Sequence, residues 1–155
     1  MLLYLLRHAE AEPYQANDFT RHLTEKGKAQ AGEVAEFLAS RGIRPDLILT
    51  SPVLRAKETA SIVSQKLTAD FSEVPWLVCG MHPETALEEL ASYHRLDSVM
   101  IVGHEPDFSL LIALLLGLES SLSLNVSKAS LAAIDLPGIL PRTGVLRFFL
   151  PVTLI

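Results

Sequence analysis

The sequence predicts an α/β domain in three layers, with a mainly parallel central sheet and helices on both faces. Short apolar runs of strand length alternate with longer segments of helical periodicity along the 155 residues, and this alternation is typical of a parallel sheet built from β-α units. The first run, residues 2–6, is apolar throughout, which is the pattern of a strand covered on both faces. The length is typical of one domain, so we expect residues 1–155 to form a single unit.

Six segments are expected to be strands, because each is short and rich in apolar residues. They are residues 2–6, 46–50, 73–77, 98–102, 130–136 and 145–150. The fourth is a clear buried strand that ends at a glycine. The last two are expected at the side of the sheet, and the sequence does not fix their direction.

Four helices are expected between these strands, at residues 24–42, 52–67, 83–93 and 106–117. The first starts after Thr24 and stops at Gly42, since glycine commonly follows the end of a helix. The second is expected to have Ser51 as its N-cap and Pro52 as its first residue. Pro106 opens the last helix, which is apolar enough to be buried.

The composition excludes several classes of protein. With 49% hydrophobic and 20% charged residues the chain is not disordered, and its net charge of −5 has the wrong sign for nucleic-acid binding. Cys79 is the only cysteine, which excludes an internal disulfide and a cysteine-cluster metal site and fits a reducing cytoplasm. The apolar stretch 108–118 is shorter than the ~20 residues of a membrane span, and residues 2–6 lack the basic residue that precedes a signal-peptide core. We expect a cytoplasmic monomer.

Cationic and imidazole side chains follow three of the expected strands. Arg7 and His8 come directly after the first strand, Arg55 lies one helical turn after the second, and His104 follows the strand at 98–102. Ligands bind at the carboxyl ends of parallel strands, so these four side chains are expected at one edge. Guanidinium groups fit phosphate oxygens bidentately, and imidazoles act as nucleophiles, acids or bases near neutral pH. The pattern therefore predicts a phosphate pocket that contains a nucleophile.

The remaining histidines have no comparable placement. We expect His22, His82 and His94 on the surface or on helices, and a single arginine or histidine in a loop is usually only a solvated polar residue. A metal hydrolase built on His8 and His104 is disfavoured, because no pair of histidines has the spacing of metal ligands.

Four sequence segments resemble the histidine phosphatase (phosphoglycerate mutase-like) superfamily, and most closely its SixA-type phosphohistidine phosphatase branch. They are LRHAEA at 6–11, RHLTEKG at 21–27, SPVLRAKET at 51–59 and VGHEP at 102–106. The resemblance extends in order from residue 2 to about residue 117. It implies the phosphoglycerate mutase-like fold, with His8 as the residue that becomes phosphorylated.

The resemblance also implies roles for the other residues of the pocket. Arg7 and Arg55 would clamp the phosphoryl oxygens, His104 would complete the pocket, and Arg21 would be an additional substrate contact. We expect neutral His8 to attack through one ring nitrogen while the other donates to a fixed acceptor, with His104 protonated. Neither a metal nor another cofactor is expected, because the arginines neutralise the phosphoryl charge.

The leaving group separates the possible substrates. An alkoxide needs a proton, and Glu84 is the only candidate acid in a region that matches an acid-bearing motif poorly. An imidazole departs with less help, which favours a phosphohistidine on a signalling or carrier protein. The alternatives are a phosphomonoesterase of broad specificity and a domain that binds phosphate without turnover.

Overall fold

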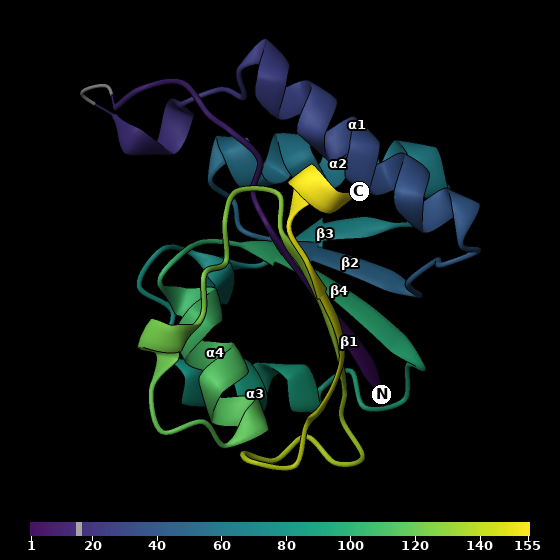
Figure 1. Cartoon of the computed structure of the whole chain (residues 1–155), viewed down its shortest axis with the longest axis vertical. Coiled ribbons are helices and arrows are strands. Elements are labelled where there is room, and N and C mark those ends of the chain that lie inside the picture. Colours follow the sequence, from purple (N-terminus) through teal and green to yellow (C-terminus); the bar gives the residue numbers. More distant parts are fainter. Residues whose placement is uncertain (15–16) are drawn as a thin grey trace.

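The predicted α/β arrangement is confirmed by a computed structural model that describes residues 1–14 and 17–155. Helices α1 and α2 lie on one side of the central sheet, and α3 and α4 lie on the other (Figure 1). The strands are β1 (Leu2–Arg7), β2 (Leu47–Thr50), β3 (Phe71–Glu73), β4 (Ser98–Gly103), β5 (Leu131–Asp135) and β6 (Val145–Leu150). The α-helices are α1 (Glu25–Ser40), α2 (Leu54–Leu67), α3 (Pro83–Ala91) and α4 (Asp107–Leu116). Short 3-10 helices are η1 (Asp18–Thr20), η2 (Pro75–Leu77), η3 (Ser121–Ser123) and η4 (Val152–Leu154).

The sheet is mixed, with the strand order β3-β2-β4-β1-β5-β6. The first four strands along the chain run parallel to one another, whereas β5 is antiparallel to β1 and β6 is antiparallel to β5. The direction of the last two strands, which the sequence left open, is therefore settled by their pairing. The parallel strands β1, β2 and β4 lie next to one another, so their carboxyl ends form one continuous edge.

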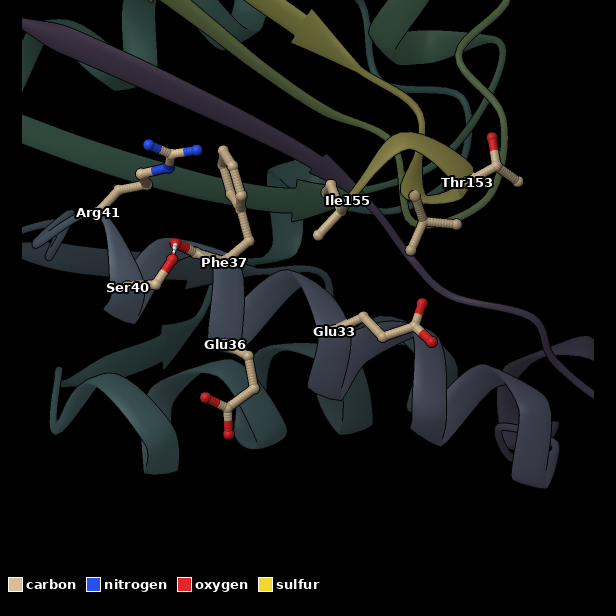
Figure 2. Close-up of a pocket in the computed structure, with 8 residues that line it drawn as sticks. Glu33, Glu36, Phe37, Ser40, Arg41, Thr153 and Ile155 are labelled. Carbon is tan, nitrogen blue, oxygen red and sulfur yellow. Dashed lines mark hydrogen bonds between the residues drawn. The ribbon is translucent and has the colours of Figure 1, made fainter.

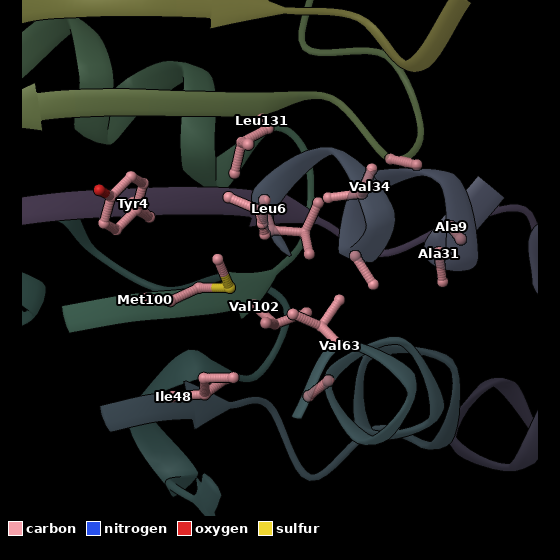
Figure 3. Packing of buried hydrophobic residues seen from close by; sticks show 14 of the residues in the cluster. Tyr4, Leu6, Ala9, Ala31, Val34, Ile48, Val63, Met100, Val102 and Leu131 are labelled. Atoms are coloured by element: carbon pink, nitrogen blue, oxygen red, sulfur yellow. The ribbon is translucent and has the colours of Figure 1, made fainter. Parts of the chain in front are cut away.

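Two hydrophobic clusters cover the two faces of this sheet. Along β1, the side chains of Tyr4 and Leu6 enter the cluster under α1 and α2, which Figure 3 shows. Those of Leu3 and Leu5 enter the cluster under α3 and α4. Successive side chains of a strand point to opposite faces, so a wholly apolar run is what a strand in the middle layer requires. A shift in register by one residue would exchange the two faces and is disfavoured by this packing.

The helix boundaries follow the capping signals at three of the expected places. The Thr24 hydroxyl accepts a hydrogen bond from the Gly27 N–H at 3.0 Å and caps α1. Gly42 and Gly117, which follow α1 and α4, have φ angles of +66° and +70°, a conformation that glycine adopts without steric cost. Helix α4 is largely buried, as expected. Within the described ranges, no helix combines the length and hydropathy that a membrane crossing requires.

Two local expectations are wrong. Helix α2 begins at Leu54 with Val53 as its N-cap, not at Pro52. The hydroxyl of Ser51 accepts from the Val53 N–H at 3.3 Å, in the turn ahead of the helix, and also contacts a histidine of the sheet edge. The third strand ends at Glu73, two residues before Pro75 opens the 3-10 helix η2. Proline has no N–H for a strand ladder, so the apolar residues that follow it pack as a turn.

Two glycines of α1 provide a matched test of this packing. A Cβ on Gly27 would lie only 1.9 Å from the carbonyl oxygen of Glu10, so we expect Gly27→Ala to lower the free energy of unfolding by about 1–3 kcal/mol. A Cβ on Gly32 would have no neighbour within 4 Å, so Gly32→Ala is expected to raise it by about 0.5–1 kcal/mol. Urea unfolding of both variants measures the two values, and equal effects would contradict the close approach at Gly27.

Candidate active site

The carboxyl edge of the sheet brings together the residues that the sequence singles out. In the strand register Arg7 pairs with Gly103 and Thr50 pairs with Val102, so the residues that follow β1, β2 and β4 start at the same level. His8 and His104 consequently lie with their ring centroids 5.2 Å apart. We call His8, Arg55 and His104, together with the neighbouring Arg7, the strand-end cluster.

His8 is buried, with 6% of its surface exposed, and its ring orientation is fixed on both sides. Its Nδ1 lies 2.8 Å from the carbonyl oxygen of Ala9. A carbonyl can only accept, so Nδ1 carries the proton and Nε2 carries the lone pair. Burial, with the nearby positive charges adding to it, lowers the pKa of His8 to about 3. The imidazole is therefore neutral at neutral pH and presents Nε2 to the cluster.

Arg55 lies in the first turn of α2 and occupies the centre of the cluster. Only 4% of its surface is exposed. Its Nε donates to His8 Nε2 at 3.2 Å, and its Nη2 lies 3.5 Å from His104 Nδ1. A buried guanidinium stays charged and requires partners. Arg55 thus places a permanent positive charge between the two imidazoles.

His104 is neutral in this structure, which corrects the expectation of a protonated ring. Its Nε2 lies 2.9 Å from the hydroxyl of Ser51, while Nδ1 faces the donor Nη2 of Arg55. Because Arg55 can only donate, Nδ1 is the acceptor and Nε2 carries the proton. Burial first, and then the charge of Arg55, lowers the pKa of His104 to about 4.

Arg7 borders the cluster from the end of β1 and keeps part of its hydrogen-bonding capacity unused. Its Nη1 donates to the carbonyl oxygen of Val126 at 2.8 Å. Among the side-chain N and O atoms of the described residues, only Arg7 Nε is buried without a partner. Burial lowers the pKa of Arg7, and the charge of the nearby Glu105 opposes this effect. The guanidinium remains charged and has an N–H available for an anion.

Among the hydrogen bonds of the described residues, Arg21 is joined to the cluster through Asp18. Its Nε donates to Oδ1 of Asp18 at 2.8 Å, and its Nη1 donates to the carbonyl oxygen of Glu12 at 2.8 Å. The other carboxylate oxygen of Asp18 accepts from Arg55 Nη2 at 3.0 Å. The Asp18 carboxylate therefore lies between Arg21, the predicted additional substrate contact, and Arg55, a predicted phosphoryl clamp.

Three residues of this site were missed as functional candidates. Ser51 was interpreted as a helix cap but hydrogen-bonds His104, Asp18 carried no sequence signal of its own, and Cys79 Sγ accepts from Arg55 Nη2 at 3.4 Å. Only Ser51 had a usable signal, since it follows β2 directly at the same edge. Glu84, the candidate acid, lies exposed in the first turn of α3, and none of the hydrogen bonds between described residues joins it to the cluster.

A separate groove of about 800 Å³ lies between α1 and the C-terminal turn η4 (Figure 2). Its lining combines the carboxylates of Glu33 and Glu36 with apolar side chains such as Phe37 and Ile155. It contains no member of the strand-end cluster, so it offers no phosphate clamp. Within the described part of the chain, no three His, Cys, Asp or Glu residues gather to hold a metal ion.

Comparisons with known proteins agree with this geometry. The model of the histidine phosphatase superfamily (branch 1) matches residues 3–78. An uncharacterised protein of Picosynechococcus is 36% identical over 116 residues, which are 69% of this chain and 68% of that protein. The structure of a SixA candidate phosphohistidine phosphatase from Agrobacterium tumefaciens is 30% identical, with a TM-score of 0.84 over 97% of each chain. A SixA protein histidine phosphatase in complex with tungstate shares the fold, with a TM-score of 0.89 at 22% identity over 99% of this chain and 98% of that one.

A cluster of two arginines and two histidines at the carboxyl edge of such a sheet is typical of enzymes that hydrolyse phosphates. The chain belongs to the histidine phosphatase superfamily. Larger relatives contain much that has no counterpart here: the mitochondrial serine/threonine phosphatase Pgam5 of Drosophila ananassae aligns over 72 residues, or 25% of its length.

The depressed pKa values of His8 and His104 make folding sensitive to acid. Both rings are neutral when folded, but they take up protons in the unfolded chain as the pH falls below the ordinary histidine pKa near 6.5. Acidification from pH 6.5 towards 4 therefore favours the unfolded state. We expect His8→Gln to reduce the pH slope of the free energy of unfolding by up to about 1.4 kcal/mol per pH unit. Urea unfolding between pH 4 and 7 measures the slope, and an unchanged slope would show that His8 is not held neutral.

Proposed function

We propose that the chain is a phosphohistidine phosphatase that removes phosphate from a phosphohistidine of a signalling or carrier protein, through a covalent phosphoryl intermediate on His8. The observation that carries the proposal is the state of His8. Its ring is neutral, its Nδ1 proton is fixed by the Ala9 carbonyl, and its Nε2 lone pair faces the centre of a cationic cluster. These are the requirements for a nitrogen nucleophile towards phosphorus.

In the first step, His8 Nε2 gives up its hydrogen bond from Arg55 Nε and forms a bond to phosphorus, while the bond between phosphorus and the substrate imidazole nitrogen breaks. The electron pair leaves with the substrate imidazole, which takes a proton from water. Arg7 and Arg55 neutralise the charge on the equatorial phosphoryl oxygens, and the Nε2–H of His104 can donate to one of them after leaving Ser51. Loss of one such preorganised donor typically lowers the rate by ~10²- to 10³-fold.

In the second step, a water oxygen attacks phosphorus and the bond to His8 Nε2 breaks, releasing inorganic phosphate; one proton of the water passes to solvent and balances the proton taken up in the first step. His8 regains its Nε2 lone pair, and Nδ1 keeps its proton on the Ala9 carbonyl throughout. Positioning and charge neutralisation provide most of the catalysis in such phosphoryl transfers. Ser51 acts as a positioning residue, because it orients the ring of His104.

The carboxylates around the cluster support an imidazole as the leaving group. Glu84 is exposed on α3, and both carboxylate oxygens of Glu105 accept hydrogen bonds from Ser109. Asp18 is paired with two arginines. None of these three carboxylates is joined to His8 by a hydrogen bond between described residues, which favours a substrate whose leaving group needs little protonation.

Substitution of His8 tests the proposed intermediate. We expect His8→Ala to abolish covalent capture of ³²P from a radiolabelled phosphohistidine protein, while His94→Ala, an exposed control on the same residue type, retains it. Arg55→Lys should lower the rate of capture by about 10²-fold or more, because an ammonium cannot reproduce the planar fork. Acid-quenched gel assays report the label, and full activity of His8→Ala would exclude His8 as the nucleophile.

The substrate class is tested by comparing a phosphohistidine protein with small phosphate esters. We expect kcat/KM for the phosphohistidine protein to exceed that for small phosphate esters by more than tenfold. The value for the phosphohistidine protein should be the same in Glu84→Gln as in the unmodified protein. Phosphate release is measured for both substrates. A preference for small esters that requires Glu84 would instead indicate a phosphomonoesterase, and binding of phosphate without release from any substrate would indicate a non-catalytic domain.

A further inference from the structure

The carboxylate of Asp18 lies on the guanidinium group that is proposed to bind the phosphoryl group. Its Oδ2 accepts from Arg55 Nη2 at 3.0 Å, and the backbone carbonyl oxygen of the same residue accepts from Arg55 Nη1 at 2.8 Å. The third nitrogen of the Arg55 guanidinium, Nε, donates to His8 Nε2. Every nitrogen of Arg55 is therefore engaged by the protein itself.

Asp18 engages Arg55 in the way that a phosphoryl group would. Two oxygens of one residue accept from the two terminal nitrogens of the guanidinium, which is the fork geometry that also receives two phosphate oxygens. A carboxylate and a phosphoryl group are both anions, so they repel each other strongly if they share one fork. A phosphoryl group can take the place of the carboxylate on Nη2 of Arg55 only if the Asp18 side chain gives up that nitrogen.

Asp18 is ionised in this arrangement. Partial burial acts to raise its pKa, but the hydrogen bond from Arg21 and the charges of Arg55 and Arg21 together lower it. Asp18 therefore competes with phosphate as a full negative charge at neutral pH. The same lowered pKa makes it a poor proton donor to a leaving group.

The position of Asp18 allows it to leave Arg55 at small cost. Its side chain is 37% exposed, and it begins the single turn η1, which contains no buried residue. Arg21 binds the other carboxylate oxygen and is itself fixed on the Glu12 carbonyl. A rotation of the Asp18 carboxylate towards Arg21 would free Arg55 Nη2, while the backbone carbonyl of Asp18 stays on Nη1.

We propose that Asp18 is a built-in competitor for the phosphoryl subsite, displaced from Arg55 when the substrate phosphoryl group binds and returning when phosphate leaves. The inference rests on the proposed function and adds a determinant of its affinity. With a tethered competitor, the observed dissociation constant of an anion equals the intrinsic one divided by the fraction of time that the competitor leaves Arg55 free. Its consequence is weak retention of inorganic phosphate, the product, by a pocket that holds two arginines.

Asp18→Asn tests this role, because asparagine keeps the shape and removes the charge. We expect isothermal titration to show that inorganic phosphate binds roughly tenfold more tightly to Asp18→Asn than to the unmodified protein. The inhibition constant of phosphate in the phosphatase assay should fall by a similar factor. Asp18→Ala should behave in the same way. Asp135→Asn is the matched control, since it also removes one aspartate charge paired with an arginine. Asp135 lies in β5 opposite Leu2, at the amino end of β1 and away from the site.

Each outcome decides between named alternatives. Thermal unfolding first shows that the variants fold, and both Asp18 variants are compared so that the result does not depend on one of them. Equal phosphate affinity in the unmodified protein and the Asp18 variants would overturn the competitor role while the proposed function stands. Weaker binding in the Asp18 variants would show that Asp18 positions Arg55 instead. If phosphate bound to none of these proteins, both the competitor role and the proposed function would fail.

Discussion

A permanent positive charge, buried at the carboxyl edge of the sheet, governs the arrangement of the residues around it. The guanidinium of Arg55 cannot deprotonate to relieve the cost of burial, so the chain must surround it with acceptors. These come from three separate segments: His8 after β1, His104 after β4 and Asp18 in η1. The same charge, together with burial, keeps both imidazoles neutral. Arg55 thereby links the arrangement of the segments at the carboxyl edge to the neutral state of His8, the proposed nucleophile.

The three elements that surround Arg55 can meet there only because the sheet has a fixed register. The apolar strands β1, β2 and β4 are packed on both faces, so each strand must end at the same level as its neighbour. His8 and His104, which directly follow β1 and β4, then lie with their ring centroids 5.2 Å apart. Core packing under two pairs of helices therefore fixes the position of the site.

The balance of charge at the site differs from that of the whole protein. The chain carries a net charge of −5, yet its edge gathers Arg7, Arg21 and Arg55 around two neutral rings. A phosphoryl group is attracted by such a local excess of positive charge. The excess would also hold the product, and Asp18, shared between Arg21 and Arg55, is the charge that moderates it.

Local patterns in the sequence were sufficient to predict most helices and strands and the central residues of the candidate site. Thr24 and Gly42 marked the bounds of α1 through their capping chemistry, and apolar runs marked the strands. His8, Arg55 and His104 could be grouped in advance because the carboxyl ends of parallel strands meet. Ser51 is not the N-cap of α2, and its hydroxyl contacts both the Val53 N–H and the ring of His104. The second contact depends on the approach of β4, which local sequence does not reveal.

The sequence by itself determined most of the residues that form the strands, the side chains that follow them, and the grouping of arginines and imidazoles at one edge of the sheet. The tertiary structure alone decided the neutral state of His104, the antiparallel direction of β5 and β6, and the contact of Asp18 with Arg55. The physical reason is the range of the interactions. Periodicity and capping act within a few residues of the chain, whereas burial, strand pairing and ion pairing join residues that only the completed fold brings together.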